Sequence, residues 1–308
     1  MAAAPGQPPS PERLGVAAAL AAYLYWGLLP IYFKLIYAAP AVEIIAHRIL
    51  WSIPVLAGFL LLRDGKAFWG RMRQPWRKVM GLLLSSLLVV SNWLIFVWAV
   101  INGNVMSTSL GYFITPLVQF LLGFLVLHER MSRTKRLGVL IAAAGTVYLG
   151  WFLGTPPWIS LSLAITFGLY GLVRKLLDVG PMVGLLWETL LMALPALAYM
   201  GWAARSGNLY LGTAGLQQDV LLVLAGLITI VPLIWFNVAA RRLKLTTVGF
   251  FQYIAPTMTF LLSVFVYAEP FTQGHAVAFG CIWFALAMIS VETWQKSRAA
   301  RTQGFLAP

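Results

Sequence analysis

The sequence predicts an all-α polytopic membrane protein whose ten transmembrane helices form two inverted five-helix repeats. Three observations predict this class: an apolar composition, ten long apolar stretches, and a similarity between the two halves of the chain. Of the 308 residues, 60% are hydrophobic and 10% are charged, whereas soluble domains carry about 25% charged residues. Such a chain has too little polar surface for a water-soluble globule, which indicates a lipid environment.

The charge balance fits the same class. Twenty-two Lys and Arg against nine Asp and Glu give a net charge of +13. In a soluble protein this excess would suggest a nucleic-acid partner, but membrane proteins concentrate basic residues in cytoplasmic loops. We therefore expect a lipid bilayer, and no nucleic acid, as a partner. The single cysteine, Cys281, excludes an intrachain disulfide and a thiolate metal cluster.

Windows of about 20 residues locate the ten apolar stretches. They cover 14–36, 41–62, 79–101, 106–127, 136–153, 157–177, 182–203, 219–240, 246–268 and 274–294. Residues 1–12 are rich in Pro and Ala and lack a basic n-region, and the first stretch is too long for a signal-peptide core. This predicts a disordered cytoplasmic tail followed by a membrane helix. Residues 296–308 are expected to form a second cytoplasmic tail.

The basic residues alternate between successive loops. Most of them fall in one set of segments: Arg13, 63–78, 130–136, 174–175, 241–244 and 296–301. The opposite set holds Lys34 and Arg205, and Arg48 lies inside a stretch. Because Lys and Arg of short loops stay on the cytoplasmic side, this split places both termini in the cytoplasm.

Shifting the chain on itself by 140 to 141 residues aligns residues 13–153 with residues 154–295. Identical pairs include Ile114/Ile254, Pro116/Pro256, Phe120/Phe260, Glu129/Glu269, Gly27/Gly168, Lys34/Lys175 and Pro54/Pro195. An odd number of helices in each half turns the second repeat upside down, as in many secondary transporters. An old duplication kept only for packing is the alternative.

Several prolines lie deep within the predicted spans. They are Pro54, Pro116, Pro195, Pro232 and Pro256. A proline inside a helix removes a backbone hydrogen bond and bends the helix, and in lipid the freed carbonyl must face protein or a wet cavity. Because four of the five form repeat-related pairs, we expect hinges or cavity-lining positions. Static kinks fixed by packing are the alternative.

Ionisable side chains at membrane depth are energetically expensive, so they mark candidate sites. They are Lys34, Glu43, His47, Arg48 and Glu188. Glu43 and His47 are four residues apart and share a helix face. At the 141-residue offset His47 corresponds to Glu188, so we expect that either both line a central cleft or neither does. There Arg48 and Glu188 would lower each other's desolvation penalty. Snorkelling to an interface is the alternative, above all for Lys34 and Arg48.

Amide and aromatic side chains gather at related depths. The candidates are Asn92, Trp93, Tyr112, Asn237, Gln252 and Tyr253. Stacking faces with sparse hydrogen-bonding groups suit a pocket for a modest organic solute, although helix packing or an interfacial belt would also use such aromatics. Gly138 and Ala142 form a small-residue patch that suits either close helix contact or a homodimer seam.

Motifs for catalysis are absent from the sequence. It has no phosphate-binding GxxxxGK[ST] loop, no HExxH, no GxSxG elbow and no paired metal ligands. We therefore expect no catalytic residue, cofactor or metal site, and no ATP-driven pump. A channel would need a continuous polar stripe, whereas the polar groups here are scattered.

Several dense motifs resemble the RarD branch of the drug/metabolite transporter superfamily, which has two EamA-type halves. They lie at 26–34 (WGLLPIYFK), 43–52 (EIIAHRILWS), 92–99 (NWLIFVWA), 109–117 (SLGYFITPL), 167–175 (FGLYGLVRK), 188–189 (ET), 240–243 (ARRL) and 249–257 (GFFQYIAPT). The resemblance covers the chain from about Gly15 to Glu292. It implies ten helices, termini inside, a bacterial inner-membrane location and transport of small organic compounds. It does not name a substrate.

Together these observations favour a secondary active or facilitative transporter, most simply an exporter of small metabolites or drugs working by alternating access. The ionisable residues would line the route, and a titrating His47 or Glu188 would couple transport to protons. Proton antiport and facilitated exchange stay open. A membrane channel and a polytopic membrane enzyme are the alternatives from other classes.

Overall fold

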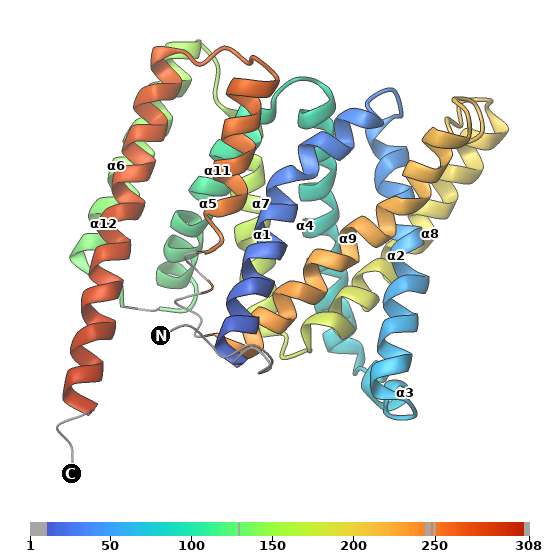
Figure 1. Ribbon diagram of the computed structural model, residues 1–308, viewed down its shortest axis with the longest axis horizontal. Helices are drawn as coiled ribbons and strands as arrows, with labels where there is room; N and C mark the ends of the chain where they lie inside the picture. The colour runs from blue at the N-terminus through green and yellow to red at the C-terminus, as the bar shows by residue number, and fades with distance from the viewer. Residues whose placement is uncertain (1–10, 129, 244–247, 249–250, 305–308) are drawn as a thin grey trace, which may run out of the picture. The chain divides into compact units, whose positions relative to one another are not determined.

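The computed structural model describes residues 11–128, 130–243, 248 and 251–304, and all regular structure among them is helical (Figure 1). The elements are α1 (Pro11–Leu35), α2 (Ala41–Asp64), α3 (Ala67–Met72), α4 (Trp76–Ile101), α5 (Val105–Leu125), α6 (Arg133–Leu153), α7 (Trp158–Leu176), α8 (Pro181–Arg205), α9 (Leu216–Arg242), α11 (Ile254–Leu261), η1 (Leu262–Val266) and α12 (Gln273–Gly304).

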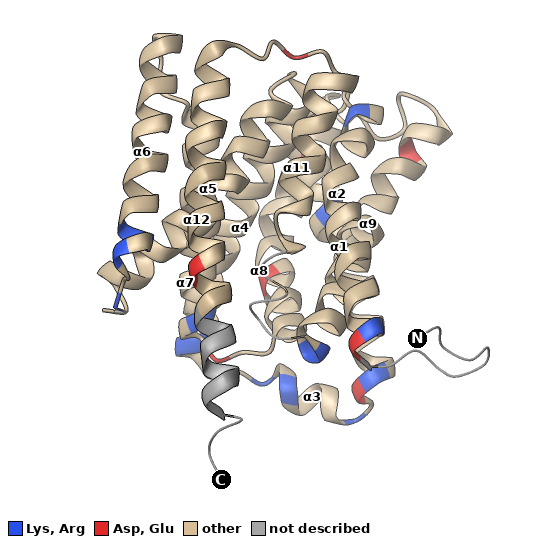
Figure 2. Ribbon diagram, turned by 60° about the vertical axis from the view of Figure 1, so that its left-hand side comes forward, with Lys and Arg blue, Asp and Glu red and all other residues tan. Residues whose placement is uncertain are grey.

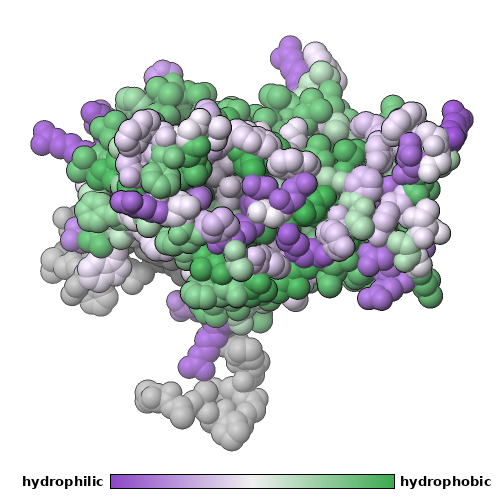
Figure 3. Space-filling model, turned by 90° about the horizontal axis from the view of Figure 1, so that it is seen from above, coloured by the Kyte–Doolittle hydropathy of each residue, from purple (hydrophilic) through white to green (hydrophobic). Residues whose placement is uncertain are grey.

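Nine helices in this described part are long and apolar enough to cross a membrane. They match nine of the predicted stretches to within a few residues, which confirms the all-α polytopic membrane class. The remaining stretch, 246–268, corresponds to the shorter apolar helix Ile254–Val266, and most of its beginning lies outside the described residues. Both hydrophobic and hydrophilic side chains are visible on the surface seen from above (Figure 3).

The predicted tails are described only in part. Residues 1–10 lie outside the described residues, and α1 already begins at Pro11. At the other end α12 continues as far as Gly304, well beyond residue 295, and residues 305–308 are outside the description.

Local signals explain where the helices begin. Pro40, Pro75 and Pro157 stand directly before α2, α4 and α7, and Pro181 is the first residue of α8. Proline suits these positions because the first N–H groups of a helix have no partner within it. Ser132 precedes α6, and its side chain accepts a hydrogen bond from the backbone N–H of Lys135 at 3.2 Å, as an N-cap residue does.

The chain divides into two compact units. The first unit is formed by Met1–Met72 with Pro181–Met258, and the second unit by Arg73–Gly180 with Thr259–Pro308. Each unit therefore combines helices from both predicted sequence repeats. A repeat of the sequence is not by itself a compact body.

In the first unit α1 packs against α9, and α2 packs against both α8 and α9. A core cluster joins Ala19 and Tyr23, early in α1, to Ala239 and Leu243, at the end of α9. The start of one helix thus lies beside the end of the other, so α1 and α9 are antiparallel.

In the second unit α5 packs against α7, α7 against α4, and α6 against α12. A Cβ atom added at Gly138 would lie 2.9 Å from the side chain of Ile289, and one at Gly145 would lie 2.6 Å from Cβ of Cys281. Gly138 of the predicted small-residue patch therefore allows close contact between α6 and α12.

Two glycine contacts repeat between the halves of the sequence. A Cβ at Gly27 would lie 2.6 Å from Cβ of Met258 in the first unit, and a Cβ at Gly168 would lie 2.8 Å from Cγ1 of Val118 in the second. Gly27 and Gly168 are repeat-related, as are Val118 and Met258 at the 140-residue offset. The same contact is thus made twice with the roles of the two halves exchanged, which is the pattern that a duplicated unit predicts.

At Gly226 of α9 the backbone of α2 comes very close. A Cβ there would lie 2.2 Å from the backbone carbonyl carbon of Trp51 and 2.6 Å from the amide nitrogen of Ser52. Because backbone atoms cannot move aside as the end of a flexible side chain can, α2 and α9 can cross at this distance only with glycine at this position.

We expect Gly226→Ala to separate α2 from α9 and to lower stability by roughly 1 to 3 kcal/mol or more, the range for overpacked interiors. The midpoint of thermal unfolding of the purified protein measures this. Gly58→Ala in α2 is the matched control, because a Cβ there meets nothing within 4 Å. Equal midpoints for the two variants would contradict the close crossing.

Candidate functional site

Four polar side chains of α2 are buried in the first unit. Glu43 and Ser52 are 0% exposed, His47 is 2% exposed and Arg48 is 7% exposed. Because polar groups removed from water must find partners within the protein, their contacts show what this cluster can do.

Glu43 binds the backbone of the loop between α8 and α9. Its two carboxylate oxygens accept hydrogen bonds from the backbone N–H groups of Tyr210, at 3.0 Å, and Leu211, at 2.9 Å. Glu43 lies in the first turn of α2, where the helix dipole also favours negative charge. The contact therefore ties the start of α2 to the far end of the α8–α9 pair.

His47 lies one turn further along α2. Its Nδ1 accepts a hydrogen bond from the indole N–H of Trp51 at 3.1 Å. Since an indole can only donate, Nδ1 carries no proton, and the neutral ring must hold its proton on Nε2. Nε2 is buried and makes no hydrogen bond among the described residues. It lies 4.0 Å from a carboxylate oxygen of Glu43, beyond hydrogen-bond distance.

Arg48 lies inside the helix bundle. Its Nε donates to the hydroxyl of Thr229 on α9 at 2.8 Å, and its guanidinium carbon lies 6.0 Å from the ring centroid of Phe33 on α1. The Thr229 hydroxyl in turn donates to the carbonyl of Ala225 at 2.8 Å. The charge is therefore held between α1 and α9 by hydrogen bonding and by ring contact.

Two hydroxyl groups extend this network and were not predicted as site residues. The Ser52 hydroxyl donates to the carbonyl of Arg48 at 2.6 Å and lies 3.5 Å from that of Gly226. The Tyr32 hydroxyl donates to the carbonyl of Leu221 at 2.8 Å. Hydroxyl residues are common in apolar helices, so sequence alone offered only a weak signal.

Glu188 is also buried in the first unit, at 1% exposure on α8. It lies next to Thr189, whose hydroxyl donates to the carbonyls of Leu185 and Leu186. Lys34, near the end of α1, is half-buried. The structure places Glu188 inside a packed bundle and leaves Lys34 partly open.

A second polar cluster lies in the second unit. The amide of Asn92 donates to the carbonyl of Leu163 at 3.0 Å and to the hydroxyl of Thr166 at 2.9 Å, and its oxygen accepts from the Tyr112 hydroxyl at 3.0 Å. Asn92 is 0% exposed. Its amide thus joins α4, α5 and α7.

Aromatic rings complete this second cluster. The ring centroid of Tyr112 lies 5.7 Å from that of Phe96 and 5.9 Å from that of Phe167. Trp93, beside Asn92 on α4, is half-buried. The predicted residues Asn92 and Tyr112 therefore meet in one place.

Three more predicted residues lie near the end of α9 and directly before α11. Asn237 is half-buried in α9, and Gln252 and Tyr253 are half-buried in the turn directly before α11.

Glu269, another residue not predicted for the site, makes a contact in the second unit that resembles that of Glu43. Its carboxylate oxygens accept from the backbone N–H groups of Val105, at 2.7 Å, and Met106, at 2.6 Å. These are the first residues of α5, whose N–H groups lack partners within the helix. The sequence could have indicated Glu269 because the repeat-related position also holds a glutamate, Glu129. Glu129 itself lies outside the described residues.

The predicted hinge prolines fall into two groups. Pro54 and Pro195, a repeat-related pair, are exposed, whereas Pro116, Pro232 and Pro256 are buried. Pro116 lies within the continuous helix α5, but its counterpart Pro256 lies in the first turn of α11, after a break at residues 252–253. The two repeats thus use the same proline in different backbone settings.

The end of the same helical segment is also irregular. η1 is a π-helical turn, closed by a hydrogen bond from the N–H of Tyr267 to the carbonyl of Leu262 at 2.9 Å. Such turns are often found at functional sites. A break before α11 and a π-turn after it make this the least regular span in the described part of the chain.

We expect Glu43→Gln to weaken the attachment of the α8–α9 loop, because the amide keeps one acceptor oxygen and directs N–H groups at a backbone donor. The loss is expected to be about 1 to 3 kcal/mol, measured as a lower thermal midpoint and faster proteolysis within 206–215. Asp219→Asn is the control, since Asp219 accepts one exposed N–H from Gly212 at 2.8 Å in the same loop. An equal or larger effect of Asp219→Asn would contradict the role of Glu43 in attaching this loop.

Comparisons with known proteins agree with this architecture. The model of the EamA-like transporter family matches residues 13–151. Protein RarD of Salmonella typhi is 44% identical over 91% of this chain and 95% of its own, and Protein RarD of Escherichia coli K12 is 42% identical over the same shares. An uncharacterized transporter of Pseudomonas aeruginosa is 41% identical over 93% of this chain and 96% of its own.

A solved crystal structure shares the fold. It matches 91% of this chain and 98% of its own with a TM-score of 0.61 at 19% identity. The identities of the relatives extend over nearly the whole chain, well beyond the matched first half. The protein is therefore a multi-pass membrane protein that belongs to the RarD family of EamA-like transporters.

Proposed function

We propose that this protein is a secondary transporter of the bacterial inner membrane that exports small organic metabolites or drugs by alternating access. The observation that carries the proposal is the placement of Glu43, His47, Arg48 and Glu188 inside the first unit. Ionisable groups kept at membrane depth and held between helices are typical of solute and proton pathways. The clustering of Asn92, Tyr112 and aromatic rings in the second unit supports a route for an organic solute.

The distribution of charge within each unit supports cytoplasmic termini. In the first unit basic residues lie at the start of α1 (Arg13), at the end of α2 (Arg63), in α3 (Arg71) and at the end of α9 (Arg241 and Arg242). In the second unit the start of α6 and the end of α7 carry basic residues at one end (Figure 2). The opposite helix ends of this unit, near 101–105, 153–158 and 266–273, have no Lys or Arg. The basic end of each unit would face the cytoplasm.

The test is transport by the purified protein in proteoliposomes. One relative is named a chloramphenicol-sensitive protein RarD, at 28% identity over 94% of this chain, so radiolabelled chloramphenicol is the first probe, followed by metabolites found to accumulate in cells without the gene. Saturable counterflow is expected of a carrier. Non-saturable flux would indicate a channel, and chemical conversion of the probe would indicate an enzyme.

Arg48→Gln is expected to reduce counterflow at least tenfold, because a neutral side chain cannot replace the charge held between Thr229 and Phe33. Arg242→Gln is the matched control, since Arg242 is exposed and donates to the carbonyl of Val238 in its own helix. Folded yield by gel filtration separates loss of transport from loss of fold. Full counterflow by folded Arg48→Gln would remove Arg48 from the route.

His47→Gln tests proton coupling, because glutamine keeps polarity but cannot exchange a proton in this range. If His47 gains and loses a proton during transport, wild-type export should accelerate with an imposed proton gradient, and the variant should exchange substrate at a rate independent of that gradient. His275→Gln is the control, since His275 contacts Thr272 in the second unit. If His47→Gln still responds to the proton gradient, His47 is not the coupling residue. Glu188→Gln then tests Glu188 in the same assay.

A further inference from the structure

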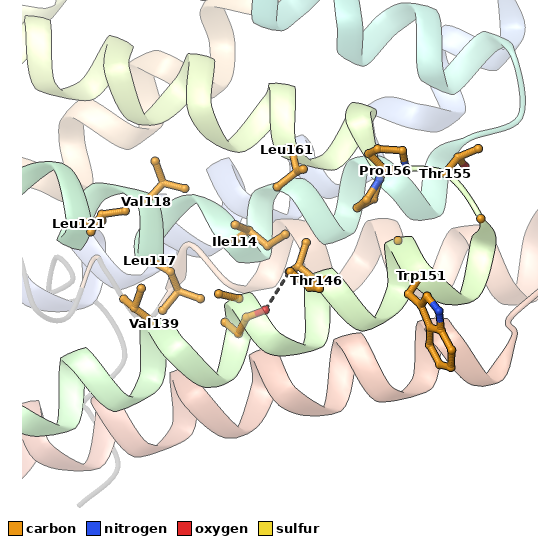
Figure 4. A pocket seen from close by; sticks show the side chains of 16 residues that line it. Ile114, Leu117, Val118, Leu121, Val139, Thr146, Trp151, Thr155, Pro156 and Leu161 are labelled. Atoms are coloured by element: carbon orange, nitrogen blue, oxygen red, sulfur yellow. Dashed lines mark hydrogen bonds between the residues drawn. The ribbon is translucent and has the colours of Figure 1, made fainter.

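A groove opens on the second unit between α5, α6 and the start of α7. It encloses a volume of about 550 Å³. Its walls include Leu117 and Leu121 of α5 and Val139, Ala143, Val147 and Trp151 of α6 (Figure 4). The clusters described above lie elsewhere, since none of their residues lines this groove.

The walls of the groove are apolar. Thr146, near the middle, donates its hydroxyl hydrogen to the carbonyl of Ala142 in its own helix at 2.8 Å (Figure 4). That hydroxyl is therefore satisfied without a ligand. A polar solute or an ordered water would find few partners here, whereas a hydrocarbon chain needs none.

The groove has the length and the opening that suit an acyl chain. Val139 and Trp151 mark its ends on α6, and twelve residues of helix at 1.5 Å each extend about 18 Å, slightly more than half of a hydrocarbon core of about 30 Å. Val147 is 71% exposed and Trp151 is 76% exposed. The groove is thus open sideways, toward the place of lipid in a membrane-spanning helix.

Two cations are held at one end of the groove. The guanidinium carbon of Arg136 lies 5.6 Å from the ring centroid of Phe124, and Nζ of Lys135 lies 4.7 Å from that of Phe120. At roughly 100° per residue, Arg136 lies within about 20° of Ala143 around α6. By the same arithmetic Phe124 lies within about 20° of Leu117 around α5. The Arg136–Phe124 pair therefore stands on the groove face of both helices, one turn beyond its last wall residues.

The surroundings of this end keep a positive excess. Glu292 of α12 accepts a hydrogen bond from the Ser132 hydroxyl at 2.8 Å, directly before α6. Among the residues that the structure describes around this end, this carboxylate stands against Arg133, Lys135 and Arg136 of the first turn of α6. The groove is apolar, is about as long as one leaflet is thick and has cations at one end. These features match the acyl chain and the negatively charged headgroup of an anionic phospholipid.

We propose that an anionic phospholipid of the cytoplasmic leaflet binds here, with one acyl chain in the groove and its phosphate at Arg136 and Lys135. Basic groups between helices at the cytoplasmic side attract anionic headgroups. The choice of leaflet rests on the orientation proposed above, but the site itself depends only on the groove and its charged end. If the protein proved not to transport solutes, the lipid site would still stand.

Native mass spectrometry of the purified full-length protein tests the site, with phosphatidylglycerol or phosphatidylcholine added to the detergent as probes. Ala143→Phe fills the groove, and Ala144→Phe is its matched control, because Ala144 is equally exposed on α6 but does not line the groove. Lys135→Gln with Arg136→Gln removes the cations. Arg73→Gln with Arg77→Gln removes two exposed charges elsewhere in the second unit.

We expect the wild type to retain phosphatidylglycerol over phosphatidylcholine and Ala143→Phe to lose that lipid while Ala144→Phe keeps it. The Lys135/Arg136 double variant is expected to retain phosphatidylglycerol about 25-fold less, roughly fivefold for each cation, with phosphatidylcholine unchanged. This double variant changes a half-buried residue and an exposed one, so it also tests the site if Ala143→Phe misfolds.

Three results would overturn the proposal. The first is equal retention of the two lipids by the wild type, and the second is unchanged phosphatidylglycerol retention in both the groove and the charge variants. The third is a change of oligomeric state in Ala143→Phe without a change in bound lipid, which would make a second copy of this chain the occupant.

Discussion

The first unit depends on the close crossing of α2 and α9 at Gly226. With no side chain at that point, the backbones come near enough for Ser52 to lie 3.5 Å from the carbonyl of Gly226 and for Arg48 to reach Thr229, three residues further along α9. A buried guanidinium without such partners would be energetically prohibitive in an apolar bundle. The same contact thus stabilises the helix pair and permits the charge on which the proposed transport route depends.

Two carboxylates illustrate a related solution at helix starts. Glu43 and Glu269 each accept two successive backbone N–H groups, one pair in the α8–α9 loop and the other at the start of α5. In lipid, N–H groups at the ends of helices cannot rely on water. A single acidic residue therefore fastens a loop or a helix start, and the same bonds satisfy its carboxylate oxygens.

Much of the site could be predicted from the sequence because burying charge in lipid is rare. Glu43, His47, Arg48 and Glu188 stood out as ionisable residues in apolar stretches, and the structure buries all four in one unit. Thr229, Ser52 and Tyr32 could not be singled out, since a hydroxyl in an apolar helix can always bond to its own backbone. Which hydroxyl meets Arg48 depends on the rotation of α9 against α2, and rotation is a property of packing.

The sequence by itself determined the membrane class, the approximate positions of nine spans and the family, because hydropathy, proline positions and charge alternation act locally along the chain. The tertiary structure alone decided the partners. It placed α1 and α2 with α8 and α9, gave repeat-related Pro116 and Pro256 different backbone settings, and aligned Arg136 with an apolar groove. These features arise from contacts between segments far apart in sequence, where the shape of two packed surfaces, and not the composition of either, sets the outcome.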